Sequence, residues 1–228
     1  MKDNTRMFAG MDIGDRYSEI CLLDAQGEIV ERRRIATTST SLIKYFSPKV
    51  PLTVALETCS HSPWMNETLS ELGATVVVAN ARKVALIAKN NTKSDKIDAE
   101  LLARLARSDV KLLSPVTHRS REHQIHMGAI RSRDALVRSR TMLVNHVRSA
   151  VKLIGCRLPT KSAASFHLLQ DELPASLRSE LLPLMASIHA LTTQIKAIDN
   201  SIAQIAAEHY SIAGFLREIH GVGPVTSL

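Results

Sequence analysis

The sequence contains few aromatic residues and few cysteines. Only 4% of the 228 residues are aromatic, so a core must consist mainly of Leu, Ile, Val and Ala, a composition suited to long helices and a buried sheet. The three cysteines lie far apart and form no CxxC pair, which argues against a disulfide framework and a zinc ribbon. No apolar run approaches the roughly 20 residues that span a bilayer, and the N-terminus lacks an apolar stretch of signal-peptide length. We therefore expect a cytoplasmic protein without membrane contacts.

Positive charge is concentrated in one segment. Between Thr117 and Arg157 lie nine basic and two acidic residues, which account for the whole net charge of +7. Such a segment is typical of a protein that binds a polyanion, although a solvated helix face is the alternative interpretation. The candidate nucleic-acid contacts in this segment are Arg131, Arg133, Arg138, Arg140, Arg148 and Lys152.

Residues 1–115 alternate strand and helix signals, which predicts an α/β domain. The expected strands are Met7–Ile13, Ser18–Leu23, Glu28–Ile35, Leu52–Glu57 and Ala74–Ala79. Asp24-Ala25-Gln26-Gly27 is typical of a hairpin turn. Helices are expected over about residues 62–72, ending at Gly73, over a stretch before Asp95, and over Asp95–Ala106. Three antiparallel strands followed by strand–helix alternation indicate a mixed sheet with helices packed on it.

Residues 116–210 have the pattern of long helices, which makes the fold class α/β followed by all-α. Apolar residues recur at alternating spacings of four and three, which is typical of a coiled coil. They are Leu177, Leu181, Leu184, Ile188, Leu191, Ile195, Ile198, Ile202 and Ile205. Pro183 interrupts this run and predicts that the helix begins there. The sequence leaves open whether the helices pair within one chain or with another subunit.

Residues 211–228 include a glycine-rich turn, Gly221-Val222-Gly223-Pro224. Backbone N–H groups of such a turn can approach a phosphate, although one GxG is weak support for a binding site. The turn is of the kind that opens a further helix. We therefore expect a domain boundary here, and a chain shorter than the complete protein.

Four acidic residues stand at the ends of predicted elements. Asp12 and Glu57 each end a strand, and Asp95 and Asp98 begin a helix, where a spacing of three places both carboxylates on one face. Taken singly, each is explained as a turn residue or a helix cap. The four together are more specific, because carboxylate oxygens are the ligands that Mg²⁺ prefers.

A Mg²⁺ or Mn²⁺ site would suit phosphoryl transfer, in which paired ions about 3.5–4 Å apart activate the attacking oxygen and stabilise the leaving one. Lys93 and Lys96 lie beside two of the acids in the sequence. We expect them to neutralise charge at the site or to contact phosphate.

Several motifs resemble one family. GMDIG, ALETCSHSPW, KSDKIDAELLARLAR and IHGVGPVTSL are similar to motifs of the DEDD transposases of bridge-RNA-guided insertion sequences and of the related pilin-gene-inverting recombinases. The resemblance covers the whole chain, and KSDKIDA is its most specific part. It implies a ribonuclease-H-like catalytic domain, similar to Holliday-junction resolvases, followed by a helical coiled coil. It also implies that Asp12, Glu57, Asp95 and Asp98 bind metal.

The resemblance further implies Mg²⁺-dependent cleavage and exchange of DNA strands, directed by a structured guide RNA, in a homo-oligomer formed through the helical region. In the family, residues like GVGPVT open a C-terminal domain that carries a serine nucleophile, which joins covalently to DNA. No serine of this sequence lies in a matching motif, so none is assigned. We therefore expect the chain to be an incomplete enzyme.

Two other functions remain as alternatives. The chain could be a non-catalytic nucleic-acid-binding and dimerisation module, in which the acids are structural. It could also be an actin-like ATPase or sugar kinase, because MDIGDRYSEICLLD resembles their first phosphate hairpin. Those folds need a second glycine-containing phosphate loop and an adenosine-binding segment, and neither is found in the sequence.

Histidines are a further candidate for a metal site. His118, His123 and His126 lie close together in the sequence. Without cysteine or acidic partners at ligand spacing, they are interpreted as polar residues of a helix.

Overall fold

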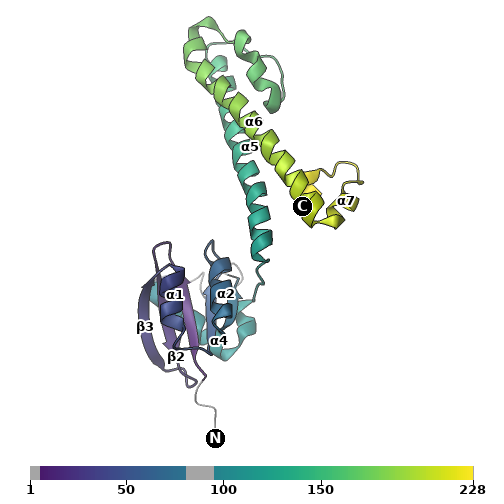
Figure 1. Cartoon of the computed structure of the whole chain (residues 1–228). Helices are drawn as coiled ribbons and strands as arrows, with labels where there is room; N and C mark the ends of the chain where they lie inside the picture. The colour runs from purple at the N-terminus through teal and green to yellow at the C-terminus, as the bar shows by residue number, and fades with distance from the viewer. Residues whose placement is uncertain (1–5, 81–94, 228) are drawn as a thin grey trace. The chain divides into compact units, whose positions relative to one another are not determined.

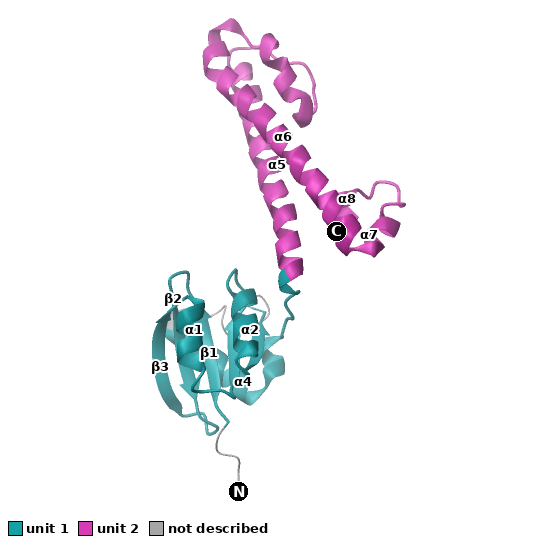
Figure 2. Cartoon of the chain, viewed as in Figure 1, with its two compact units in different colours: residues 1–121 teal, residues 122–228 magenta. Residues whose placement is uncertain are grey.

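The computed structural model describes residues 6–80 and 95–227. The chain forms two compact units, residues 1–121 and 122–228 (Figures 1 and 2). The first unit is a mixed sheet with helices and the second is all-helical, which confirms the expected fold class. The helix expected before Asp95, and Lys93 with it, lie outside the described residues.

Unit 1 contains a five-stranded sheet with the strand order β3-β2-β1-β4-β5. Strands β1, β4 and β5 are parallel, whereas β2 is antiparallel to both β1 and β3. The strands are β1 (Phe8–Ile13), β2 (Tyr17–Leu23), β3 (Ile29–Ala36), β4 (Thr53–Glu57) and β5 (Thr75–Ala79). The helices are α1 (Ser39–Phe46), α2 (Ser62–Glu71), α4 (Asp95–Ser108) and the 3₁₀ helix η1 (Val110–Leu113). The five predicted strands are confirmed.

The predicted turn between β2 and β3 is also confirmed. The Asp24 carboxylate accepts hydrogen bonds from the backbone N–H groups of Gln26 and Glu28, each at 2.9 Å. Gly27 then adopts a φ of 90°, a conformation that glycine reaches without steric cost. Asp24 and Gly27 therefore determine where this hairpin turns and which backbone conformation it adopts.

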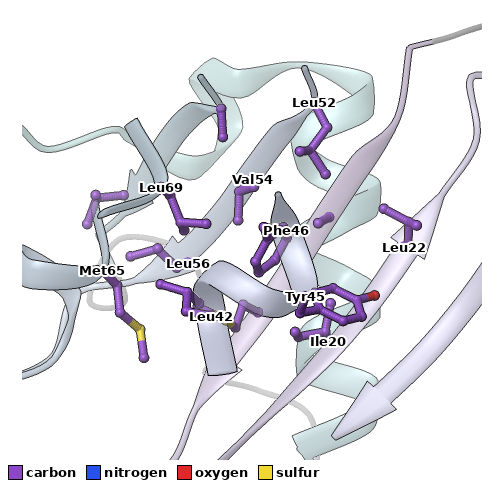
Figure 3. Close-up of a cluster of buried hydrophobic side chains, with 14 residues drawn as sticks. Ile20, Leu22, Leu42, Tyr45, Phe46, Leu52, Val54, Leu56, Met65 and Leu69 are labelled. Carbon is purple, nitrogen blue, oxygen red and sulfur yellow. The ribbon is translucent and has the colours of Figure 1, made fainter. Parts of the chain in front are cut away.

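Helices α1 and α2 cover one face of the sheet. The pleat points alternate side chains of β1 and β4 to this face, where Met11 and Leu56 are fully buried. Leu42 and Phe46 of α1 and Met65 of α2 pack on them (Figure 3). This cluster is the main apolar core of unit 1.

Helix α4 covers the opposite face and approaches β1 very closely. A Cβ atom on Gly10 would lie 2.0 Å from the carbonyl oxygen of Ala99 and 2.4 Å from the backbone nitrogen of Ala103. Only glycine therefore lets the helix backbone pack directly on the strand. Ala103 is fully buried and Ala99 nearly so, so small residues on both elements make this contact possible.

Unit 2 is built on two long helices, α5 (Arg121–Leu153) and α6 (Arg178–His209). Between them lie the 3₁₀ segments η2 (Ala163–Glu172) and η3 (Ala175–Leu177), and after them come α7 (Ser211–Leu216) and α8 (Pro224–Ser227). Arg140 of α5 contacts Thr192 of α6, and Arg133, nearer the start of α5, pairs with Asp199, farther along α6. The two helices are therefore antiparallel, which is one of the two arrangements that the sequence left open.

Only four of the nine predicted seam residues lie on the buried face of α6. Leu181, Ile188, Ile195 and Ile202 are buried as expected, but they alternate with Met185, Thr192 and Ala206. The other five predicted seam residues are half-exposed: Leu177, Leu184, Leu191, Ile198 and Ile205. Thr192 is buried where Arg140 of α5 donates a hydrogen bond to its hydroxyl group.

The expected start of α6 at Pro183 is wrong. The helix begins at Arg178, and Pro183 lies inside it with an exposed side chain. A proline near a helix start removes only one backbone hydrogen bond. The preceding turn η3 leads directly into the helix, so the helix starts before the proline.

One segment, Ala175–His209, is long and apolar enough to cross a membrane by length and composition alone. This is weak support for a membrane span, because the core helix of a soluble protein gives the same result. The segment also carries Lys196 and Asp199, and Asp199 forms an ion pair with Arg133.

Candidate metal and nucleic-acid site

Asp12 and Glu57 lie side by side at one edge of the sheet. Their strands are parallel, and Met11 pairs with Leu56, so the two acids occupy the next position on neighbouring strands. Side chains alternate along a strand, which places Asp12 on the face of Gly10, the face that α4 covers. Both acidic residues are half-buried.

The direction of α4 brings its first turn to the same edge. Near the C-terminal end of α4, Arg104 and Arg107 donate hydrogen bonds to the carbonyl oxygens of Gly27 and Ala25, at 3.1 and 3.3 Å. These carbonyls belong to the β2–β3 turn, next to the start of β1. The first turn of α4 therefore lies at the opposite edge of the sheet, where β1 and β4 end.

Asp98 lies in this first turn. Its Oδ1 atom is buried, and no described residue provides it with a hydrogen-bond partner. Burying a carboxylate oxygen without a donor costs free energy, and a cation would offset that cost. Asp95 begins the helix, three residues before Asp98, although its side chain is outside the described residues. The carboxylate groups at this edge suit a hard divalent cation such as Mg²⁺.

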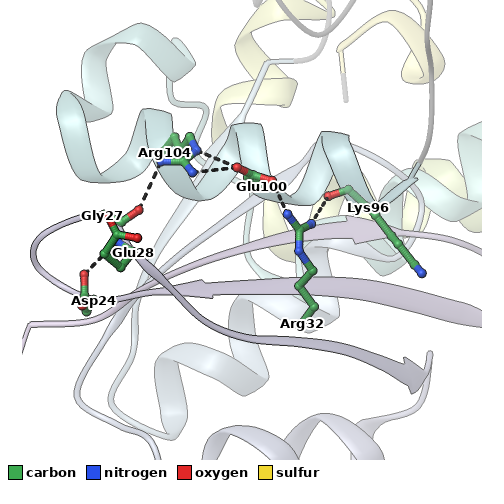
Figure 4. Close-up of polar contacts among 7 residues, drawn as sticks. All are labelled: Asp24, Gly27, Glu28, Arg32, Lys96, Glu100 and Arg104. Atoms are coloured by element: carbon green, nitrogen blue, oxygen red, sulfur yellow. Dashed lines mark hydrogen bonds and ion pairs between the residues drawn. The ribbon is translucent and has the colours of Figure 1, made fainter.

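A further acid of α4, Glu100, has a different role. It pairs with Arg32 of β3 and with Arg104, whose Nε donates to it at 2.8 Å (Figure 4). Burial raises the pKa of this carboxyl, but the hydrogen bonds from Arg104 and Arg32 outweigh that effect and hold the pKa below its usual value. With both arginines bound to it, Glu100 positions α4 on the sheet.

The loops after β1 and β4 bring a further pair of residues to the acidic edge. His61 Nε2 lies 3.5 Å from Asp15 Oδ1, and the indole N–H of Trp64 donates to His61 Nδ1 at 3.2 Å. The pairing of Asp15 with His61 was not predicted from the sequence. A signal was present, because Asp15 and His61 each follow a strand-ending acid by three or four residues.

The six basic candidates on α5 fall into two groups. Arg133 pairs with Asp199, Arg140 donates to Thr192, and Arg148 donates to the carbonyl of Lys161. The other three, Arg131, Arg138 and Lys152, are exposed. Their spacings of seven and fourteen residues place them on one face of the helix.

Lys96, on the first turn of α4, is also exposed. Its backbone carbonyl accepts a hydrogen bond from Arg32 at 3.3 Å, and its side chain extends away from Arg32 (Figure 4). The side chain is therefore available to a ligand at this edge.

Comparison with known proteins gives consistent results. Residues 9–155 match the DEDD transposase family of the IS110 type, described as "Transposase". The transposase for insertion sequence element IS1328 of Yersinia enterocolitica is 29% identical over 224 residues, which cover 96% of this chain and 65% of the relative. The transposase for insertion sequence element IS1111A of Coxiella burnetii is 27% identical over 233 residues, covering 96% of this chain and 60% of the relative.

A probable family 20 transposase of Pseudomonas aeruginosa is 28% identical, with 96% of this chain and 65% of the relative covered. The chain thus spans slightly less than two thirds of the length of these relatives. The family match begins in β1 and continues to the end of α5, so it includes the strand-ending acids, α4 and the basic segment. With more than half of its residues matched, the chain belongs to the DEDD transposase family of the IS110 type.

Proposed function

We propose that this chain takes part in DNA transposition, through Mg²⁺- or Mn²⁺-dependent cleavage and exchange of DNA strands directed by a structured guide RNA. In this proposal Asp12, Glu57, Asp95 and Asp98 bind the cation. The observation that carries the proposal is the meeting of two strand ends and the first turn of α4 at one edge of the sheet.

The residues of the chain would have distinct tasks at this edge. Divalent ions supply charge neutralisation at a phosphate and activation of the attacking oxygen. Asp12 and Glu57 would hold the ion on the rigid sheet, and Asp98 would hold it on α4. The direct contact of α4 with Gly10 fixes the helix on the strand, and its N-terminal dipole favours carboxylates in the first turn. The proposal leaves the nucleophile unassigned.

Nucleic acid would bind along the exposed basic residues. Arg131 and Lys152 are better placed for this than Arg133, Arg140 and Arg148, whose side chains already have intramolecular contacts. Arg138 is exposed but pairs with Asp134. Lys93 and Lys96 would contact phosphate at the acidic edge. In this scheme residues 1–115 are catalytic, residues 116–210 form the basic arm, and residues 211–228 begin a further domain.

The helical unit would also form a homo-oligomer. Leu184, Leu191, Ile198 and Ile205 follow one another at intervals of seven residues along α6 and are half-exposed. An apolar stripe with this repeat is typical of a helix that pairs with another helix. Leu184 packs against the core of unit 2, whereas Leu191, Ile198 and Ile205 are not among the buried residues of α6 and would meet a second copy of the chain.

Metal binding by the chain tests the proposal. Isothermal titration with Mg²⁺ and with Mn²⁺ should give binding that Asp98→Asn abolishes or weakens at least tenfold, because one carboxylate ligand is lost. Asp15→Asn is the matched control, since Asp15 is a highly exposed acid at the same edge. It should bind like the wild type.

The same metal titration, together with measurements of nucleic-acid and ATP binding, tests the rival functions. If Asp98→Asn binds Mg²⁺ and Mn²⁺ with unchanged affinity while nucleic-acid binding persists, the acids are structural and the chain is a non-catalytic binding module. If the chain instead binds ATP, the actin-like alternative is restored. Retained nucleic-acid binding with lost metal binding supports the proposed function.

A further inference from the structure

The second unit contains a group of metal-ligating side chains far in sequence from the acidic edge. Glu122 and His126 stand one turn apart near the start of α5, and His209 is the last residue of α6. One ligand atom from each of these residues lies within 4.8 Å of the other two. His126 is a polar residue of a helix, as predicted, but it does have an acidic residue at ligand spacing: Glu122 lies four residues before it, and the fold adds His209.

The contacts within the group orient its members. His209 Nδ1 lies 3.0 Å from Glu122 Oε1, and the rings of His126 and His209 have centroids 4.6 Å apart. His126 Nδ1 lies 2.9 Å from the hydroxyl of Tyr210. A hydrogen bond to one ring nitrogen fixes the tautomer and directs the other nitrogen, here Nε2 of His126, toward a metal. Tyr210 thus acts as an orienting partner for His126.

We propose that Glu122, His126 and His209 form a Zn²⁺ site that joins the start of α5 to the end of α6. Two imidazoles and one carboxylate are a ligand set that suits Zn²⁺ and other late transition metals, and not Mg²⁺. In a tetrahedral site with ligand distances of 2.0–2.2 Å, the ligand atoms lie about 3.3 Å apart. Glu122 Oε1 and His209 Nδ1 are close to this separation, at 3.0 Å, and the ligand atom of His126 lies within 4.8 Å of both residues' ligand atoms.

The surroundings allow an ion to enter. Glu122 is 62% exposed and His209 is 40% exposed, whereas His126 is half-buried. A fourth position is left for water, and a carboxylate oxygen of Glu208 lies 3.9 Å from His209 Nε2. Binding would exchange a proton of the His209–Glu122 hydrogen bond for the ion, without a change of redox state. The ion would hold together the open ends of the two antiparallel helices, directly before α7.

This site lies in a different unit from the proposed Mg²⁺ site, so each can fail without the other. The test is calorimetric titration of the chain with Zn²⁺ in the presence of excess Mg²⁺. The Mg²⁺ occupies the proposed acidic site of unit 1, so that Zn²⁺ binding reports on unit 2. We expect one tight Zn²⁺ site in the wild type and in Asp98→Asn. His126→Ala and His209→Ala should weaken binding at least about 100-fold, since loss of a ligand costs more than loss of an outer partner.

Matched controls exist on the same two helices. His146 is an exposed residue of α5, and His189 of α6 stacks on His167, with ring centroids 4.4 Å apart. His146→Ala and His189→Ala should bind Zn²⁺ like the wild type. Loss of binding in His189→Ala would place the ion at the other histidine pair and overturn the proposal, as would unchanged binding in His126→Ala.

Two further measurements guard against misfolded variants. Glu122→Gln keeps the size and helix propensity of an exposed side chain, so weakened Zn²⁺ binding by this variant supports the site independently of folding. X-ray absorption of the Zn²⁺-loaded chain should show a first shell of nitrogen and oxygen with scattering from two imidazoles. A shell without imidazole scattering would contradict the proposal.

Discussion

The two units bury their apolar residues in different ways. In unit 1 both faces of the sheet are covered, by α1 and α2 on one side and by α4 on the other, and the helix backbone packs directly on Gly10. In unit 2 two long helices share a narrow core that includes Thr192 and Ala206. Unit 1 therefore holds its acidic side chains in fixed positions. Unit 2 leaves basic residues of α5 exposed and apolar residues of α6 half-exposed.

This difference agrees with the proposal that unit 1 carries the metal site and that unit 2 binds nucleic acid and a second subunit. The proposed metal-dependent chemistry needs carboxylates held in fixed positions, and a sheet edge beside a tightly packed helix would supply them. Binding of nucleic acid or of a second subunit needs exposed surface, which the helical unit has. Substitutions that separate these two properties test the comparison.

The largest effect is expected at Gly10. Gly10→Val should unfold unit 1 or displace α4, at a cost above about 3 kcal/mol, because the new side chain would overlap the backbone of Ala99 and Ala103. Gly128→Ala in α5 is the control, since a Cβ there meets no described atom within 4 Å. It should stabilise the chain by up to about 1 kcal/mol through helix propensity. Urea denaturation followed by circular dichroism measures both. Equal stability of the two variants would show that the close contact of α4 with β1 is not required.

The core and the exposed stripe of α6 should respond differently. Ile188→Ala removes a fully buried side chain and should cost about 3 kcal/mol. Leu191→Ala removes a half-exposed one and should leave the monomer folded while shifting the oligomer toward monomer. Thermal unfolding and sedimentation velocity separate the two effects. An unchanged oligomer in Leu191→Ala would rule out the stripe as the subunit contact.

Charge reversal on α5 should weaken nucleic-acid binding several-fold. Arg131→Glu removes one exposed positive charge, and the slope of log affinity against log salt concentration should fall by about 1. Lys44→Glu, an exposed lysine on α1, is the control in unit 1 and should have little effect. Fluorescence anisotropy over a salt series measures both slopes. If Lys44→Glu has the larger effect, nucleic acid binds the sheet unit instead.

The smallest effect is expected from ion pairs. Because the pKa of Glu100 is lowered in the folded chain, its contribution to stability is complete above its unfolded pKa of about 4.3 and disappears as the pH falls through the folded value. Glu100→Gln should therefore cost at most about 1 kcal/mol at neutral pH and nothing at pH about 2. Asp134→Asn breaks a much more exposed pair with Arg138 and should cost less. Denaturation at several pH values checks the order, and a larger loss in Asp134→Asn would reverse it.

Local patterns in the sequence predicted most of unit 1. The five strands and the turn at Gly27 follow from alternation and turn chemistry. The direction of α4 could not be predicted, because it depends on contacts such as that of Arg104 with Gly27, 77 residues apart. Local sequence patterns therefore identify Asp12 and Asp98 as candidates, but they do not show that the two residues lie at the same edge of the sheet.

Unit 2 was predicted less completely, for a similar reason. The spacing of leucine and isoleucine predicted four of the seven buried residues of α6. It could not predict Thr192, a polar residue that is buried in contact with Arg140. The group around His126 was missed because His209 lies 83 residues away in the sequence. The spacing of Glu122 and His126 by one helical turn was the available signal.

The proposed metal site consists of the acids at the ends of β1 and β4 and at the start of α4, which would hold a divalent ion. The most direct measurement is a crystal structure of the chain grown with Mn²⁺, with the ion located by its anomalous scattering. We expect an anomalous peak within coordination distance of Asp12, Glu57 and Asp98, and its loss in Asp98→Asn. A well-ordered acidic edge without a peak at saturating Mn²⁺, or a peak only at Glu122, His126 and His209, would contradict this proposal.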